Sequence, residues 1–172
     1  MSDQDYTTTL FNLGFNFLPN FNDLYYLHVR RMRMESCIFC EIIHKKVEAH
    51  IIFENEYVCC FLDKYPINKG HILIVPKTHY AEFRNVDEKS LSEVMNLAKK
   101  MAILLEHLFP TDGITILQEN GIFKDVEHYH MHVIPRYKDD GFYLVEPENG
   151  VKPEDFMELT IKMQEYLHKE AI

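Results

Sequence analysis

Three histidines recur at every second position in one short segment: His128, His130 and His132 in "HYHMHVIPR". Side chains two residues apart on an extended strand point to the same face. A strand rise of about 3.3 Å per residue would place such imidazoles about 6–7 Å apart. Imidazole titrates near neutral pH and serves as a base, nucleophile or metal ligand. A solvated polar face is the competing interpretation, but three histidines with apolar residues between them favour a row of reactive groups.

A second group with chemical potential is the pair Cys37 and Cys40 in "CIFC", at the start of a predicted helix. Two thiolates at this spacing can share one zinc ion if two further ligands come from elsewhere, and His79 and His128 are the candidates. A thioredoxin-like redox pair is a rival interpretation, although no βαβ pattern surrounds the two cysteines. A third interpretation is that the two cysteines are small buried side chains with no chemical function.

Two polar residues lie at the ends of predicted strands. Asp63 ends the segment "YVCCFLD", and His71 begins the segment "GHILIVP". Asp63 can form a turn or accept hydrogen bonds from ligand hydroxyls. A lone histidine at the start of a buried strand is more often structural than functional, so position alone leaves both interpretations of His71 open.

The elements that must position these groups follow from the hydrophobic periodicity after Glu35. Their order predicts an α+β domain, with a mostly antiparallel sheet and a long helix packed across it. The predicted elements are a short helix in 35–46 with Ser36 as its N-cap, strands at 50–55, 57–63 and 70–76, a long helix at 87–108, strands at 113–120 and 129–136, and a last helix at about 153–169 opening at Pro153. The predicted apolar stripe of the long helix consists of Leu91, Val94, Met95, Leu97, Ala98, Met101, Leu104, Leu105 and Leu108.

A length of 172 residues fits one domain with a substantial core. Residues 1–34 differ from the rest, because they are rich in Asn, Phe and Tyr and show no clean period. They could be a loosely ordered extension, an arm between subunits, or sequence upstream of a natural start at Met32 or Met34, and we favour the last. We therefore divide the chain into this extension, a domain at 35–137 and a C-terminal segment with a helix at 138–172.

The composition excludes several classes of protein. A net charge of −9 gives no overall field that would draw the chain to nucleic acid or to an anionic membrane. No apolar run reaches membrane-spanning length, and the N-terminal region lacks a signal-peptide pattern. Cys59 and Cys60 are adjacent on a predicted strand, so they point to opposite faces and cannot form an ordinary disulfide with each other. This cysteine usage predicts a reducing, cytoplasmic location.

Taken together, the motifs resemble the histidine triad (HIT) family. The resemblance comprises the His-x-His-x-His strand followed by "IPR", the upstream "GHILIVPKTH", the earlier "FLD" and the opening "CIFCEII". It extends from about Cys37 to Tyr137 and keeps the family's order and approximate spacing. The cysteine pair is similar to the zinc-bearing, Hint-like branch. The resemblance implies a HIT-like fold, a homodimer and a purine nucleotide as substrate.

The resemblance also implies roles for individual residues. His130 would be the nucleophile that becomes nucleotidylated, His132 would bind and neutralise the phosphate, and His71 would lie beside it. Cys37, Cys40, His79 and His128 would hold a structural zinc ion, and Asp63 would receive the ribose hydroxyls. The residues implied for nucleotide binding are Phe39, Ile42, Val47, Phe61, Leu62, Asp63 and Asn120.

The sequence departs from the family pattern just before the triad. The family usually has a Gly-Gln-Ser-Val-like stretch there, whose serine contacts the phosphate, whereas this chain has "FKDV" and a shorter connection. Asp125 occupies the serine position, where an acid should repel an anionic ligand. Either Lys124 offsets this charge or the shorter loop turns Asp125 away.

Three functional hypotheses follow. The first is a hydrolase or nucleotidyl transferase that cleaves nucleoside phosphoramidates or dinucleoside polyphosphates through a nucleotidyl-histidine. The second is a catalytically weak nucleotide-binding regulatory module, which the "FKDV" stretch favours. The third is a zinc-stabilised interaction protein that binds a partner through residues 1–33.

Overall fold

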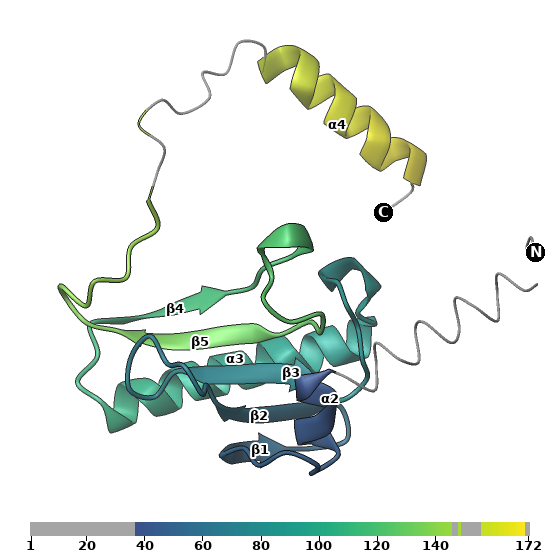
Figure 1. Cartoon of the computed structure of the whole chain (residues 1–172). Helices are drawn as coiled ribbons and strands as arrows, with labels where there is room; N and C mark the ends of the chain where they lie inside the picture. The colour runs from purple at the N-terminus through teal and green to yellow at the C-terminus, as the bar shows by residue number, and fades with distance from the viewer. Residues whose placement is uncertain (1–36, 146–147, 149–155, 171–172) are drawn as a thin grey trace, which may run out of the picture. The chain divides into compact units, whose positions relative to one another are not determined.

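The computed structural model describes residues 37–145, residue 148 and residues 156–170 (Figure 1). The chain divides into two compact units, one ending at Asp140 and the other beginning at Gly141. The predicted extension at 1–34 lies outside the described residues. All the motifs that could carry chemistry belong to the first unit.

The first unit is built on a five-stranded antiparallel sheet with the strand order β1-β2-β3-β5-β4. The predicted fold class, an α+β domain with an antiparallel sheet, is therefore confirmed. The strands are β1 (Ile51–Glu54), β2 (Val58–Leu62), β3 (Ile72–Pro76), β4 (Gly113–Leu117) and β5 (Met131–Arg136).

The long helix α3 (Glu88–Leu108) packs across one face of this sheet (Figure 1). It begins where predicted, because the Asp87 carboxylate accepts a hydrogen bond of 2.9 Å from the Ser90 amide and caps the first turn. Its apolar stripe contacts alternate residues of the strands, such as Ile72 and Ile74 of β3. The predicted stripe is too wide, however, since Met95 and Leu108 are exposed. Neither side chain packs against the core cluster between α3 and the sheet.

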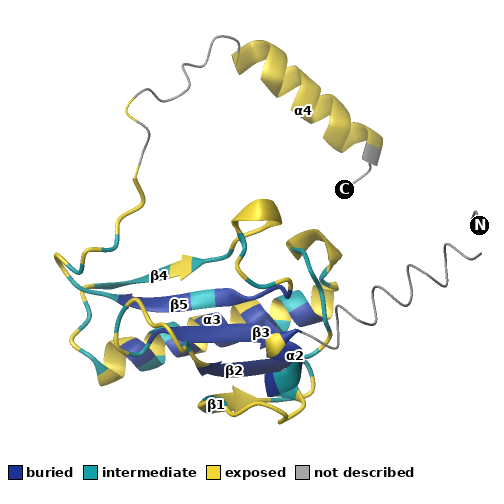
Figure 2. Cartoon of the chain, viewed as in Figure 1, coloured by how far each residue is buried: buried dark blue, intermediate teal, exposed yellow. Residues whose placement is uncertain are grey.

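The short helix α2 (Ile38–Ile43) packs on the opposite face of the sheet, against the residues of β2 and β3 that point away from α3 (Figure 2). Phe61 and Leu73 are two of these residues. The N-cap position is held by Cys37 instead of Ser36, and Ser36 lies outside the described residues. The alternation of the strands thus gives the sheet two cores, and α2 brings its cysteines to the second.

The triad segment is only partly a strand, which corrects the predicted strand at 129–136. Strand β5 begins at Met131, so His128 and His130 precede it. The reason is local hydrogen bonding, because the His128 amide donates to the Val126 carbonyl at 2.8 Å and bends the chain. The histidines therefore do not form a straight row, and His128 is free to face a different group from the other two.

The second unit contains the helix α4 (Phe156–Glu170). The predicted opening of this helix at Pro153 falls outside the described residues. All side chains described in α4 are exposed. No helix within the described ranges has both the length and the apolar character needed to cross a bilayer.

Candidate functional site

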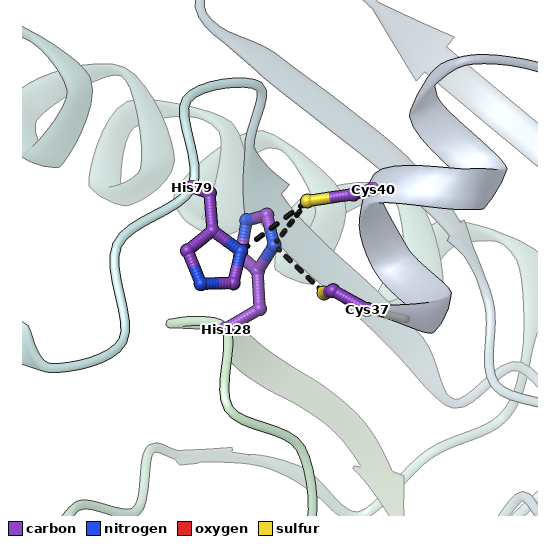
Figure 3. Close-up of side chains that lie close together, drawn as sticks. All are labelled: Cys37, Cys40, His79 and His128. Carbon is purple, nitrogen blue, oxygen red and sulfur yellow. Dashed lines mark hydrogen bonds between the residues drawn. The ribbon is translucent and has the colours of Figure 1, made fainter. Parts of the chain in front are cut away.

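Four potential metal ligands come together from three parts of the chain: Cys37, Cys40, His79 and His128 (Figure 3). Their four potential donor atoms all lie within 4.8 Å of one another. The Cys40 sulfur lies 3.2 Å from Nδ1 of His79 and 3.6 Å from Nδ1 of His128, and the Cys37 sulfur lies 3.5 Å from the latter. Ligands at the usual zinc distances of 2.0–2.3 Å form the edges of a tetrahedron about 3.3–3.8 Å long. The three measured separations fit such a tetrahedron closely.

The orientation of His128 fits a metal ligand as well. Its Nε2 donates a hydrogen bond of 2.9 Å to the carbonyl of Pro76, at the end of β3. Because the proton is held on Nε2, the lone pair of Nδ1 points at the two sulfurs. The Pro76 carbonyl thus fixes the tautomer that a metal would need.

Burial sets the protonation of this cluster when no ion is bound. Desolvation, together with the neighbouring Cys37, raises the pKa of the Cys40 thiol to about 12. Desolvation also lowers the pKa of His128 to about 4, against a smaller opposing effect from its hydrogen bond to Pro76. A neutral imidazole is the form that binds metal, whereas the thiol would release its proton when a cation arrives. The donor set therefore fits zinc and is closed by four protein ligands.

His130 faces away from this cluster and has its own tautomer fixed. Its Nδ1 donates a hydrogen bond of 2.6 Å to the carbonyl of His128. The neutral ring therefore carries its free lone pair on Nε2. The edge-on ring of Phe39, with centroids 5.1 Å apart, packs against the imidazole and restricts its rotation.

His132 and His71 form a hydrogen-bonded pair beside His130. Nδ1 of His132 lies 2.9 Å from Nε2 of His71, and the rings of His130 and His132 have centroids 4.9 Å apart. The Ile67 amide donates to Nδ1 of His71 at 3.2 Å, so the neutral His71 carries its proton on Nε2. His71 then donates to Nδ1 of His132, and the proton of His132 is left on Nε2. The hydrogen bonds from Ile67 to His71 and from His71 to His132 therefore leave Nε2 of His132 able to donate to a ligand.

The charges around this pair are set by burial and by Asp63. Desolvation lowers the pKa of His132 to about 4, and the neighbouring His130 and His71 act in the same direction. Desolvation also lowers the pKa of His71, and the carboxylate of Asp63, 3.4 Å from Nδ1, opposes that effect. Both imidazoles are therefore neutral at physiological pH.

The "FKDV" stretch behaves differently from both alternatives that the sequence offered. Lys124 pairs with Glu82 and donates to the Ala81 carbonyl at 3.1 Å, so its charge is directed away from Asp125. Asp125 is not turned away either, since its Oδ1 lies 3.3 Å from Nε2 of His130. An acid that is 76% exposed thus stands next to the free lone pair of His130.

Apart from Asp63, which lies beside His71, the predicted nucleotide-binding residues divide into three groups. Phe39, Ile42 and Phe61 are buried together in the core on the α2 side of the sheet. The side chains of Val47 and Leu62 are exposed. The amide of Asn120 accepts from the Phe83 backbone at 3.0 Å and donates to Gln118, so it organises its own loop, and it forms no hydrogen bond to the histidines within the described residues.

Sequence reasoning missed the backbone groups that fix the tautomers. The carbonyls of Pro76 and His128 and the amide of Ile67 each hold one ring nitrogen of a histidine. A backbone group has the same chemistry at every position, so no residue pattern identifies it. Only the folded geometry places it against a ring.

The comparison with known families now decides the classification. The family model described as "HIT domain" matches residues 44–139. This chain belongs to the HIT domain family. The match covers β1 to β5 and includes His71, His130 and His132.

Relatives of this HIT protein include well-matched sequences from distant organisms. An uncharacterized HIT-like protein of Methanocaldococcus jannaschii is 42% identical over 107 residues, which cover 61% of this chain and 82% of the relative. Adenosine 5'-monophosphoramidase HNT1 of Candida albicans is 37% identical over 111 residues, which cover 61% of this chain and 72% of the enzyme.

Solved structures of the family match the fold of the HIT protein. A histidine triad nucleotide-binding protein from Candida albicans superposes with a TM-score of 0.70 at 32% identity, over 78% of this chain and 99% of its own. A zinc-bound histidine triad family protein from Mycobacterium smegmatis gives a TM-score of 0.60 at 28% identity, over 67% of this chain and 85% of its own.

Proposed function

We propose that this HIT protein is a nucleotide hydrolase or nucleotidyl transferase that cleaves nucleoside phosphoramidates, or dinucleoside polyphosphates, through a nucleotidyl group on His130. The observation that carries the proposal is the hydrogen bond of 2.6 Å from Nδ1 of His130 to the His128 carbonyl. In the neutral ring this bond holds the proton on Nδ1 and leaves the lone pair on Nε2, which is the nucleophilic form of imidazole and needs no separate base. The similarity to an adenosine 5'-monophosphoramidase supports the same chemistry.

His132 and His71 act on the phosphate in this proposal. The pair delivers a proton on Nε2 of His132 to the phosphate oxygens, because Ile67 and His71 fix the tautomer. A preorganised donor stabilises the negative charge that gathers on these oxygens as the leaving group departs. His132 therefore binds the phosphate as a neutral donor, and His71 positions it.

The nucleoside occupies the side of the histidines that faces α2. The buried Phe39, Ile42 and Phe61 supply apolar surface for a purine base, and the exposed Val47 and Leu62 are assigned to base binding by the family resemblance alone. Asp63 receives the ribose hydroxyls, since an ionised carboxylate can accept two hydrogen bonds from a diol. Asn120 orders the loop beside the site, because its amide already bonds within that loop.

A structural zinc ion at Cys37, Cys40, His79 and His128 is part of the proposal and places the chain in the zinc-bearing, Hint-like branch. The donor geometry and the zinc-bound relative from Mycobacterium smegmatis support it. Cys37, Cys40, His79 and His128 would hold the ion, which would cross-link the start of α2 with the segment after β3 and the segment before β5. The protein is proposed to act as a homodimer in the cytoplasm.

The experiment that tests the function uses the purified full-length protein and adenosine 5′-phosphoramidate. We expect AMP release, and we expect rapid alkaline quenching, which preserves the acid-labile P–N bond, followed by mass spectrometry to find an adenylyl group on His130. A His130→Gln variant keeps the fold and should lose both signals. Turnover without an adduct on His130, at an unchanged rate in the variant, would refute the proposed nucleophile.

A second candidate function is a nucleotide-binding module without turnover. The position of Asp125, 3.3 Å from Nε2 of His130, favours it, because the carboxylate occupies space that an attacking nitrogen needs. Binding of AMP in calorimetry without any AMP release from the phosphoramidate would establish this function instead.

A further inference from the structure

Asp125 is the one charged residue of the "FKDV" stretch that faces the histidines, and the proposed chemistry leaves it without a role. Its carboxylate oxygen lies 3.3 Å from Nε2 of His130, the atom proposed to attack phosphorus. Any phosphorus atom bonded to this nitrogen must therefore lie within a few ångströms of the carboxylate. The charge of Asp125 acts directly on the reacting group.

The contacts of Asp125 in the described residues include no lysine or arginine that would neutralise its charge. Lys124, the adjacent cation, is held by Glu82 and the Ala81 carbonyl. Among the described residues, no lysine or arginine forms an ion pair with Asp125, and no donor forms a hydrogen bond to its carboxylate. The side chain is 76% exposed, so it can swing aside when a nucleotide enters. It can then pair with a group on the ligand.

Asp125 and Asp63, the two acids near the histidines, lie on different sides of the site. Asp63 lies beside His71 and His132, and all three of these side chains are mostly buried. Asp125 lies on an exposed loop beside His130, whose other side is closed by Phe39. A group that leaves phosphorus for solvent therefore passes Asp125, whereas the nucleoside stays on the buried side.

We propose that Asp125 determines leaving-group specificity. It favours nucleoside phosphoramidates whose leaving amine bears a separate cationic group, and it disfavours anionic leaving groups such as a phosphate chain. This inference rests on the proposed function and narrows it to the phosphoramidate class. The Asp125 carboxylate repels the phosphate of every nucleotide and so weakens its binding. Attraction between the carboxylate and a cationic leaving group offsets this repulsion. The carboxylate contributes charge and takes no proton in the reaction.

The balanced reaction gives the leaving group its place beside Asp125. The lone pair of Nε2 of His130 forms the bond to phosphorus, and the P–N bond breaks with its electron pair remaining on the nitrogen. The amine takes one proton from a water molecule. The oxygen of that water ends on phosphorus when the P–Nε2 bond is hydrolysed, and the electron pair of this bond returns to Nε2. AMP and a free amine are the products.

The test compares three adenosine 5′-phosphoramidates made from 1,3-diaminopropane, propylamine and β-alanine. Their leaving groups have the same three-carbon chain and end in a cation, a methyl group and an anion. We measure kcat/KM for each with the wild type, with Asp125→Asn and with Glu119→Gln. Comparing proteins on the same three substrates cancels the intrinsic reactivity of each P–N bond. Glu119 is an exposed acid in the same β4–β5 connection and has no ion pair with the histidines within the described residues.

We expect the wild type and Glu119→Gln to prefer the cationic over the anionic leaving group by roughly tenfold or more, since attraction of the cation and repulsion of the anion at a few ångströms in water each contribute about fivefold. Asp125→Asn should reduce the preference to about twofold, and 1 M salt should reduce that of the wild type because it screens exposed charges. Asp125→Asn should also bind AMP several-fold more tightly.

An unchanged preference in a folded, active Asp125→Asn variant would overturn the inference and leave the proposed function intact. An equal loss of preference in Glu119→Gln would also overturn it, because the effect would then belong to the general field of the loop. If the wild type turns over none of the three substrates and forms no adduct on His130, the proposed function fails, and this inference fails with it.

Discussion

The two histidine clusters of this protein lie next to each other and have opposite characters. His128 and His130 are separated by one residue, yet His128 faces two cysteines in a buried cluster and His130 faces an exposed aspartate. In both, a backbone carbonyl fixes the proton of the ring, on Nε2 for His128 and on Nδ1 for His130. The lone pair of the neutral ring therefore points into a closed set of ligands in one case and toward the exposed carboxylate of Asp125 in the other. The backbone carbonyl that accepts a hydrogen bond from one ring nitrogen thus decides which nitrogen carries the lone pair and which groups that lone pair meets.

The largest effect should come from removing the open lone pair. We expect His130→Gln to reduce AMP release from adenosine 5′-phosphoramidate by roughly 10³-fold or more, the scale of a lost nucleophile. Zinc content by atomic absorption and Tm should stay close to wild type, because His130 is not a donor of the buried cluster. A variant that loses zinc along with activity would show that the two clusters are not separate.

Removing a ligand from the buried cysteine and histidine cluster should lower the stability of the protein. We expect Cys40→Ala to lose bound zinc and to lower Tm by roughly 10 °C, since a ligand at about a thousand times its Kd contributes about 4 kcal/mol and a domain of this size shifts by about 2–4 °C per kcal/mol. Cys59→Ala, which removes a buried cysteine outside the cluster, is the matched control for lost packing. Equal zinc content in the two variants would refute the assignment of the ligands.

A smaller effect is expected from His71, which positions His132. Changing His71→Asn removes the bond of 2.9 Å that fixes the tautomer of His132. The rate of adduct formation should fall by roughly 10²-fold, as for the loss of one preorganised donor. The decline should appear in kcat with little change in AMP affinity. A change confined to KM would instead assign His71 to ground-state binding.

The smallest effect is a change of stability with pH. The pKa of His132 falls from 6.5 to about 4 on folding because of desolvation and the neighbouring histidines. Between these values the unfolded chain holds the extra proton and the folded protein does not, so stability falls as the pH falls from 6.5 to 4. The loss from this residue is about 3 kcal/mol. Urea unfolding across this range should show a shallower decline for His132→Gln than for wild type, and parallel curves would contradict the assignment.

The sequence by itself determined the elements and the identity of the reactive groups. The long helix was predicted at 87–108 and found at Glu88–Leu108, because a strong apolar period and an aspartate cap act locally. The pairing of Cys37 and Cys40 with His79 and His128 was implied by the resemblance, and the structure gathers these four residues. Local propensity was sufficient for the helix, whereas the four-residue cluster needed the family motifs.

Only the tertiary structure decided how the histidines are oriented and which charges they meet. The bend that ends at Met131 separates His128 from His130, and no residue pattern marks it. The sequence offered Lys124 as a partner for Asp125, but the fold gives Lys124 to Glu82, which lies 42 positions away along the chain. Hydrogen bonds and ion pairs between distant segments depend on short distances in space. These distances are fixed when the sheet, α2 and the loops pack together, so the charge beside Nε2 of His130 is a property of the folded protein.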